Sequence, residues 1–354
     1  MPTDAPDEQL VRDLDETGLL ARIFPLLPAG AATLVGPGDD AAVVAAPDRR
    51  FVVSTDVLVE GRHFRREWSS GEDVGRRAAA QNLADVAAMG ARPTALVVSL
   101  VVPGDLPVAW VTGLARGLAG ASEPSGAAVV GGDLSGGRDV VVAVTVHGDL
   151  EGRPPVLRSG ARPGDVVALS GVRGWSAAGL AVLSTGGGAA GGRPDGGPSE
   201  DRRDADVDRA LAAYRAPAPP LADGPAAAVA GATAMLDVSD GLLRDAGRIA
   251  AASGVAIDLD GAALRPDDGL VAVADTLVRA GGERGAGAEL AATWVLTGGE
   301  DHGLLATFPA GTALPGGFRP VGRVRTAAAG EGRVSVDGAA PRVSGTGWDH
   351  FGGR

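Results

Sequence analysis

Runs of apolar residues alternate along the chain with segments in which apolar residues recur every three to four positions. The continuous run ALVVSLVV at 95–102 is typical of a buried strand, and GLLATF at 303–308 is typical of a strand. The recurring pattern at 73–89, which follows Ser70 and ends before Gly90, is typical of a helix with start and stop signals. Alternation of this kind predicts a mixed α/β fold.

The predicted elements fall into two halves that meet near residue 158. In the first half we expect a helix at 8–27, strands at 41–46 and 51–56, a helix at 73–89, a strand at 95–102, a helix at 106–121, and strands at 127–133 and 139–150. In the second half we expect a strand at 165–171, a helix from about 176, a strand at 234–238, a helix at 241–254, a strand that ends at 296–301, and a strand at 303–308. Residues 184–209 contain almost no large apolar side chains, which predicts a low-complexity surface loop.

The length of the chain favours two domains, because 354 residues are enough for two separate hydrophobic cores. We place these domains at 1–157 and 158–354. Hydrophobic residues make up 45% of the chain but aromatic residues only 3%, so the cores must consist largely of Val, Leu and Ala. The 56 glycines and 24 prolines predict many tight turns between the elements.

Charge and missing residue types exclude several classes of function. The net charge of -12 argues against a nucleic-acid or anionic-membrane partner. The chain has no cysteine and no lysine, which excludes a thiolate nucleophile, a Walker A lysine and Schiff-base chemistry. The acidic first residues lack the layout of a signal peptide, and the apolar run at 95–102 is too short to span a bilayer. We therefore expect a cytoplasmic protein.

Six short stretches place an acidic residue beside small or polar residues. The acidic residue stands at the end of a predicted strand, at the start of a predicted helix or inside a predicted helix. They are GDD (38–40), STD (54–56), Asp85 in NLADVAAMGA, GGD (131–133), DVSDG (237–241) and GGED (298–301). Each alone fits an ordinary turn, a helix cap or, for Asp85, an exposed helix carboxylate. Their repetition favours Mg²⁺ sites, because Mg²⁺ takes oxygen ligands and combines one or two carboxylates with phosphate oxygens.

The neighbouring carboxylates of Asp39 and Asp40 support this interpretation, since like charges side by side repel each other unless a cation compensates them. The hydroxyl groups of Ser54, Thr55 and Ser239 would add neutral oxygen ligands. In a chain without lysine, metal ions and arginines must neutralise the charge of a bound phosphate.

Two further residues leave two interpretations open. His63 in VEGRHF either faces a substrate or is a surface histidine beside arginines. Arg158, at the predicted domain junction, either grips a nucleotide phosphate with both guanidinium nitrogens or is a surface arginine.

Taken in order, these motifs resemble those of the thiamine-monophosphate kinases, members of the ATP-binding superfamily that includes aminoimidazole ribonucleotide synthetase. The motifs that carry the resemblance are GDDAAVV, STDVLVEGRHF, NLADVAAMGA, VVGGD, RSGARPGD, LDVSDGLLRD, GGED and GWDHF, between about residues 18 and 351. GDD, STD and GGD are typical of the superfamily, whereas VEGRHF, NLADVAAMGA and GWDHF point to this kinase.

The resemblance implies an α/β (α+β) fold with two domains, in which the N-terminal mixed-sheet domain pairs in a homodimer and the site lies near the cleft between the domains. It implies direct in-line transfer of the γ-phosphoryl group of ATP, the co-substrate, to thiamine monophosphate, with several Mg²⁺ ions. The metal ligands it implies are Asp40, Ser54, Thr55, Asp56, Asp85, Asp133, Asp237 and Asp240, of which Asp40, Asp56, Asp85 and Asp240 are the catalytic group. The ATP contacts it implies are Gly132, Asp133, Arg158 and Ser239, and the thiamine contacts are His63, Glu300 and Trp348, the last as a stacking surface.

Some residues depart from the family pattern, most clearly His302 and Gly303, where GGEDYEL is usual. Two other functions stay open. One is another ATP-using enzyme of the superfamily, of the cycloligase type. The other is a non-catalytic protein that binds divalent ions, although the dispersal of the motifs over two domains argues against it.

Overall fold

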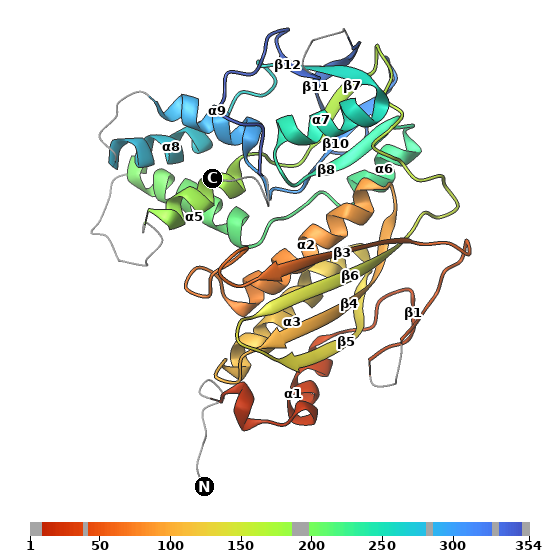
Figure 1. The fold of residues 1–354 in the computed structure, drawn as a ribbon, viewed down its shortest axis with the longest axis vertical. Coiled ribbons are helices and arrows are strands. Elements are labelled where there is room, and N and C mark those ends of the chain that lie inside the picture. The colour runs from red at the N-terminus through yellow and green to blue at the C-terminus, as the bar shows by residue number, and fades with distance from the viewer. Residues whose placement is uncertain (1–8, 38–41, 186–197, 281–285, 328–332, 349–354) are drawn as a thin grey trace. The chain divides into compact units, whose positions relative to one another are not determined.

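The computed structural model describes residues 9–37, 42–185, 198–280, 286–327 and 333–348. The chain divides into two compact units: unit 1 holds residues 1–87 and 91–154, and unit 2 holds residues 88–90 and 155–354. Each unit contains both helices and strands (Figure 1), so the predicted mixed α/β class is confirmed. Among the described residues, no helix is long and apolar enough to cross a membrane.

Unit 1 is built on a four-stranded sheet with the strand order β3-β6-β4-β5. Its strands are β3 (Val52–Val59), β4 (Arg92–Val102), β5 (Ala128–Gly136) and β6 (Val141–Asp149). β4 and β5 run parallel, because α3 (Val108–Ser122) connects them, and the other neighbours are antiparallel. Helices α2 (Gly71–Ala88) and α3 lie together on one face of this sheet (Figure 1).

Glycine allows α2 and α3 to pack with their backbones in contact. A Cβ atom at Gly75 would collide with the carbonyl oxygen of Leu114, and one at Gly117 with the carbonyl oxygen of Glu72. Small and apolar side chains then bury most of α2, including Ala79 and Leu83, which are fully buried. The alanines of this helix therefore mark close packing rather than a solvent-exposed surface.

The other face of the sheet leaves apolar side chains exposed. On and beside β3, the side chains of Phe51, Val53 and Val57 are 58%, 55% and 46% exposed. Side chains alternate between the faces of a strand, and β3 pairs Thr55 with Thr145 and Val57 with Ala143 on β6. The β6 residues beside this stripe are thus Thr145 and Ala143, both half-buried.

The N-terminal helix is shorter than the predicted 8–27. α1 (Glu16–Ile23) lies between two 3₁₀ turns, η1 (Val11–Asp13) and η2 (Phe24–Leu26). The Asp15 side chain caps α1 by accepting a hydrogen bond from the Gly18 N–H at 2.8 Å, which sets the start of the helix. The strand predicted at 41–46 is reduced to β2 (Val43–Val44), which pairs with β1 (Thr33–Val35).

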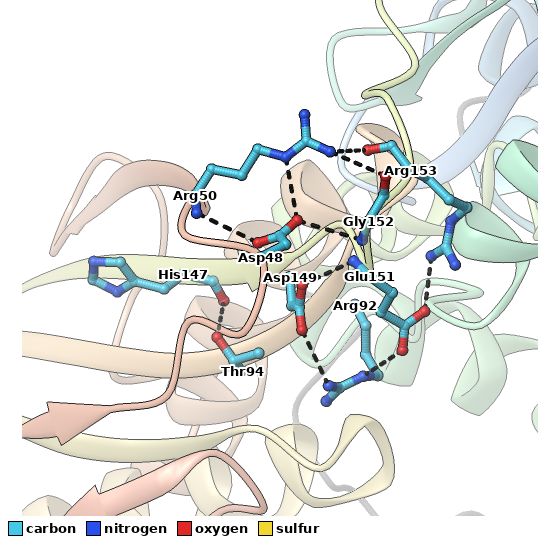
Figure 2. Close-up of polar contacts among 9 residues, drawn as sticks. All are labelled: Asp48, Arg50, Arg92, Thr94, His147, Asp149, Glu151, Gly152 and Arg153. Carbon is cyan, nitrogen blue, oxygen red and sulfur yellow. Dashed lines mark hydrogen bonds and ion pairs between the residues drawn. The ribbon is translucent and has the colours of Figure 1, made fainter.

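A polar network fixes the last residues of unit 1 against its sheet (Figure 2). The Arg50 guanidinium donates to the carbonyl oxygens of Gly152 and Arg153 at 3.2 and 2.9 Å. Arg92, the first residue of β4, binds the Glu151 carboxylate at 3.2 Å. Hydrogen bonds from Arg153 and Arg92 lower the pKa of Glu151. The turn after β6 is therefore tied to two other segments of unit 1.

Unit 2 contains a six-stranded sheet with the order β12-β9-β11-β7-β10-β8, antiparallel except for β12 beside β9. Its strands are β7 (Val166–Ser170), β8 (Ala234–Val238), β9 (Val255–Leu259), β10 (Gly303–Phe308), β11 (Arg319–Thr326) and β12 (Val334–Val336). Its helices are α4 (Trp175–Ser184), α5 (Pro198–Arg215), α6 (Asp223–Val229), α7 (Leu242–Ser253), α8 (Asp268–Ala280) and α9 (Gly287–Thr297). Every residue of β10 is buried.

Two predictions for the second half are wrong. Residues 198–209, expected in a surface loop, belong to α5, while residues 186–197 lie outside the described residues. The C-terminal part of α5 packs against Gly179 of α4 through Ala210 and Tyr214, and this contact stabilises a helix whose first half has no apolar pattern. The segment before GGED is the end of α9 and not a strand, because Ala291 and Trp294 are buried at helical spacing.

Candidate functional site

The side chain of Asp85 on α2 faces strand β3. The Ser54 hydroxyl donates a hydrogen bond to the Asp85 carboxylate at 2.7 Å. One turn earlier in α2, the buried Asn82 side chain accepts a hydrogen bond from the Asp56 N–H at 3.1 Å. Ser54 and Asp56 share one face of the strand, and Asn82 and Asp85 share one face of the helix. The structure therefore brings Ser54, Asp56 and Asp85 together, and Asp85 is half-buried rather than an exposed helix carboxylate.

Thr55 points to the opposite face of the sheet. Its hydroxyl donates to the carbonyl oxygen of Val144 at 3.0 Å and accepts from the Thr145 hydroxyl at 3.2 Å. The side chain of Thr55 is thus separated from those of Ser54 and Asp56, with which the sequence motif grouped it.

Gly132 and Asp133 lie on β5, at the opposite edge of the sheet from β3. With β6 and β4 in between, the two edges are on the order of 14 Å apart, at about 4.8 Å per strand. The exposed Asp133 carboxylate accepts a hydrogen bond from the Ser135 hydroxyl at 3.2 Å. A Cβ atom at Gly132 would collide with the carbonyl oxygen of Val98 on β4, so this position requires glycine. The sheet therefore does not place Asp133 beside Asp85.

A cavity of about 880 Å³ opens beside the GGD motif of unit 1. Its wall includes Gly132 and Asp133, and much of the remainder is apolar, with Leu114 of α3 and Phe24 of η2 as examples. Arg50, Thr94, His147 and Asp149, four of the residues drawn in Figure 2, line the cavity as well. Burial lowers the pKa of His147, which favours the neutral imidazole. An apolar cavity of this size with a few polar groups is typical of a small-molecule site.

His63 lies in the turn that follows β3. Its Nδ1 atom accepts a hydrogen bond from the Val59 N–H at 3.0 Å, so the neutral ring carries its proton on Nε2. The same turn contains an ion pair between Arg66 and Glu60 at 2.5 Å and a cation–π contact of Arg65 over Trp68 at 4.6 Å. The His63 side chain is therefore fixed to the backbone of this turn by a hydrogen bond.

Three of the sequence motifs meet at one turn of unit 2. This turn, Ser239 to Gly241, connects β8 to α7. The Glu300 N–H donates to the Ser239 carbonyl oxygen at 2.8 Å, and the Trp348 N–H donates to the Asp240 carbonyl oxygen at 2.8 Å. Gly241 has a φ of 119°, and a Cβ atom there would collide with the carbonyl of Thr297. DVSDG, GGED and the start of GWDHF thus form one local structure.

Left-handed backbone conformations mark the GGED segment. Glu300 and His302 have φ values of 68° and 52°, which are unfavourable for residues with side chains. Between them, the buried Asp301 carboxylate accepts hydrogen bonds from the N–H groups of Gly174 and Ser176, at the start of α4. Burial raises the pKa of Asp301 to about 6. Strain of this kind persists only where surrounding contacts fix the backbone, and it is concentrated at functional sites.

The family departure at His302 proves to be part of this site. The His302 Nδ1 atom lies 3.2 Å from a carboxylate oxygen of Asp237, and its Nε2 atom lies 4.0 Å from the Glu300 carboxylate. These two distances place His302 between Asp237, a predicted metal ligand, and Glu300, a predicted substrate contact. The His302 side chain is buried, with 3% of its surface exposed. In the sequence, His302 stands directly after Asp301 of GGED and so near this motif, but the sequence does not indicate its contacts with Asp237 and Glu300.

Arg248 and Asp245 on α7 also belong to this site, although the sequence did not indicate them as site residues. One nitrogen of the Arg248 guanidinium lies 2.5 Å from the Asp240 carboxylate, and the other lies 2.6 Å from the Asp245 carboxylate. The spacing of Asp245 and Arg248, three residues apart on a helix, predicts their pairing. Nothing in the sequence predicts that Asp240, which precedes the helix, joins them.

Arg158 lies away from the Ser239 turn. Its carbonyl oxygen accepts a hydrogen bond from the hydroxyl of Ser253, the last residue of α7. The turn precedes the first residue of α7, and a helix of 12 residues is about 18 Å long. The backbone of Arg158 and the turn of Ser239 are thus at opposite ends of this helix, and the Arg158 side chain is exposed.

The donor atoms at these positions suit a hard cation. Asp39 and Asp40 lie outside the described residues. In the part of the chain that the structure describes, no three His, Asp or Glu side chains converge where they could hold one metal ion. Each unit instead offers carboxylate and hydroxyl oxygens in small numbers, Ser54 with Asp85 in unit 1, and Asp237 on β8 and Asp240 in the turn that follows it in unit 2. Mg²⁺ at phosphate sites needs only one or two carboxylates, since phosphates and water complete its shell, so these residues fit the ion.

Comparison with known proteins places this architecture among described families. Residues 38–150 match the family model for AIR synthase related protein, N-terminal domain. The thiamine-monophosphate kinase of Mycobacterium tuberculosis is 45% identical over 98% of this chain and 95% of its own length. The thiamine-monophosphate kinase of Corynebacterium glutamicum is 44% identical over 89% of this chain and 88% of its own length.

Solved structures agree with the predicted fold. The structure of AaThiL complexed with AMPPCP and TMP has a TM-score of 0.71 and 30% identity, and covers 97% of this chain and 99% of that chain. The thiamine-monophosphate kinase of Stenotrophomonas maltophilia has a TM-score of 0.72 and 28% identity, over 91% of this chain and 95% of that chain. Hydrogenase maturation protein HypE in complex with ATP shares only the fold, with a TM-score of 0.62, 18% identity and 84% of each chain covered. The predicted aminoimidazole ribonucleotide synthetase-like fold is confirmed.

Proposed function

Because the chain belongs to the thiamine-monophosphate kinase family, we propose that it transfers the γ-phosphoryl group of ATP to thiamine monophosphate, giving thiamine diphosphate and ADP. The observation that carries the proposal is the 45% identity to such a kinase over 98% of the chain. The AaThiL complex with AMPPCP and TMP supports it, since that protein covers 97% of this chain with the same fold. A reaction that consumes ATP favours a cytoplasmic location, which cell fractionation would test.

The residues of the chain suit a direct in-line transfer from one phosphate to another. Such a transfer needs positioning and charge stabilisation but no covalent enzyme intermediate. This agrees with a chain that lacks both cysteine and lysine. When bound, Mg²⁺ would neutralise the charge of the transferring phosphoryl group. We propose that several Mg²⁺ ions are bound, with Asp40, Ser54, Thr55, Asp56, Asp85, Asp133, Asp237 and Asp240 as the predicted ligands. Ser54, Asp56 and Asp85 would share one ion, whereas Thr55 and Asp133 lie apart from them.

We place the nucleotide in the cavity of unit 1 beside Gly132 and Asp133. The volume of about 880 Å³ and the apolar wall suit a planar base. Gly132 contributes only backbone to this wall. Ser239 and Arg158 are the predicted ATP contacts of unit 2, and His63, Glu300 and Trp348 are the predicted contacts of thiamine monophosphate.

We propose that two copies of the chain associate through the exposed face of the unit 1 sheet. The support is the apolar stripe of Phe51, Val53 and Val57, since exposed apolar patches mark association sites. Val53→Asp should convert a dimer into a monomer in size-exclusion chromatography with light scattering. Val229→Asp is the matched control, because Val229 is 73% exposed in unit 2 and should leave the dimer intact. A Val53→Asp protein that stays dimeric would contradict this interface.

A turnover assay tests the proposed reaction. Purified protein is incubated with ATP, Mg²⁺ and thiamine monophosphate, and both ADP and thiamine diphosphate are quantified by chromatography. Equal amounts of the two products support the kinase. Turnover only with a formylglycinamidine ribonucleotide would instead indicate a cycloligase, and binding of divalent ions without any turnover would indicate a non-catalytic protein.

A further inference from the structure

The carboxylate of Asp240 is held by an arginine of the helix that follows it. Asp240 lies in the turn before α7, and Arg248 lies two turns into that helix. The Arg248 Nη2 atom is 2.5 Å from the Asp240 carboxylate, whereas the nearest nitrogen of Arg244 is 4.0 Å away. Arg248 is thus the closer of two arginines, and the Asp240 side chain beside it is only 15% exposed.

Asp245 anchors the other end of this contact. Its side chain is fully buried, and one of its oxygens accepts a hydrogen bond from the Arg248 Nη1 atom at 2.6 Å. Its other oxygen accepts from the backbone N–H groups of Asp240 and Gly241 at 3.0 and 3.1 Å. Asp245 therefore fixes both the guanidinium that binds the Asp240 side chain and the backbone that carries it.

We propose that Arg248 is a positioning residue for phosphoryl transfer. Its guanidinium is fixed by Asp245 and holds the carboxylate of Asp240 in one orientation, and we call this set of three side chains the brace. The inference rests on the proposed kinase function, in which Asp240 is a metal ligand. The guanidinium binds one carboxylate oxygen of Asp240, Oδ2, and so leaves the second oxygen available for an ion. Hydrogen bonds to a ligating carboxylate commonly set its geometry, and their loss costs about 10- to 100-fold in activity or metal affinity.

The geometry of the brace suits arginine in particular. Its two terminal nitrogens point in fixed directions from one rigid plane and can bind Asp240 and Asp245 at the same time. A lysine would carry the same charge on a single nitrogen and could not reproduce both contacts with this geometry. Arg248→Lys should therefore retain the charge but only part of the orientation.

A double-mutant cycle in the full-length protein separates positioning from a general structural role. Arg248→Ala should lower kcat by at least about 10-fold with little change in the KM for thiamine monophosphate. In an Asp240→Asn background the same substitution should change kcat by less than about 2-fold, because the group that Arg248 positions is already lost. Arg248→Lys should fall between wild type and Arg248→Ala. Arg323→Ala, which removes an arginine that is 71% exposed on β11, is the control and should keep wild-type kcat.

The melting temperature of the metal-free proteins supplies a readout that is independent of turnover. The contact of Arg248 with Asp240 predicts that Arg248→Ala lowers the Tm by a few degrees, and by less when Asp240 is already Asn. If wild-type protein turns over no thiamine monophosphate, the proposed function fails, but this cycle still measures the contact. Equal losses of kcat in both backgrounds, or a raised KM with kcat unchanged, would overturn the positioning role. If Arg248→Ala does not fold, Arg248→Lys takes its place in the cycle, and an Arg248→Lys enzyme with wild-type kcat would equally overturn it.

Discussion

Replacement of Asp85 by asparagine tests whether its carboxylate serves the reaction or the fold. Asparagine keeps the shape of the side chain and removes its charge. In the structure the Asp85 carboxylate accepts a hydrogen bond from the Ser54 hydroxyl at 2.7 Å, and the amide oxygen of asparagine can accept the same bond. A hydrogen bond to a charged group contributes about 1.5–3 kcal/mol and one between neutral groups about 0.5–1.5 kcal/mol. The expected loss in the free energy of unfolding is therefore about 1 kcal/mol.

The expected effect on catalysis is much larger. If Asp85 helps to hold the cations that neutralise the phosphoryl group, loss of its charge should lower kcat by at least about 100-fold, as when one electrostatic stabiliser is removed. The Mg²⁺ concentration that gives half-maximal turnover should rise as well. A 100-fold loss corresponds to about 2.7 kcal/mol in the barrier, clearly more than the expected loss of stability.

Three measurements decide the outcome: urea unfolding without metal, kcat with saturating substrates, and a Mg²⁺ titration of the rate. Glu72→Gln is a matched control on the same helix, because the Glu72 side chain forms an exposed pair with Arg76 and its neutralisation should change neither stability nor rate noticeably. An Asp85→Asn enzyme with wild-type kcat and unchanged Mg²⁺ dependence would refute the reasoning and leave Asp85 with a purely structural contact to Ser54.

Two further predictions concern the glycine of the GGD motif and the buried Asp301. Gly132→Ala should lower the free energy of unfolding by more than about 2 kcal/mol in urea titrations, because its added Cβ would collide with Val98. Gly131→Ala is the control: nothing lies within 4 Å of its added Cβ, and it should cost no more than about 1 kcal/mol. Equal costs for the two substitutions would contradict the close approach of Gly132 to Val98. The pKa of Asp301 is raised from 3.8 to about 6, so the native protein retains a proton that the unfolded chain has lost, and this carboxyl lowers stability as pH rises through that window. The difference in unfolding free energy between wild type and Asp301→Asn should therefore fall by roughly 2 kcal/mol from pH 4 to pH 6.5, and a constant difference would show that the pKa of Asp301 is not raised in the folded protein.

Much of the fold was predictable because its strands and helices carry strong local patterns. The strand at 303–308 agrees with β10, and the helix at 241–254 agrees with α7 to within one residue at each end. Local pattern failed where a contact distant in the sequence decides the conformation. α5 is the clearest case, since its polar first half resembles a loop and only its contact with α4 near Gly179 stabilises a helix.

By itself, the sequence determined the chemistry available to this protein. A chain without cysteine or lysine, with acidic residues repeated beside small and polar ones, points to phosphate chemistry supported by hard cations. The order of its motifs also identified the family. These conclusions need only the types and order of the residues, because donor atoms and charge belong to the side chains themselves.

Only the tertiary structure decided which of these groups act on one another. It paired Ser54 with Asp85 from 31 positions away, turned Thr55 to the other face of the sheet, and joined Asp240 to Arg248 across the start of a helix. The physical reason is that a hydrogen bond requires two atoms within about 3 Å. Strand alternation, helix faces and the ends of elements set such distances, and a list of residues in order does not contain them.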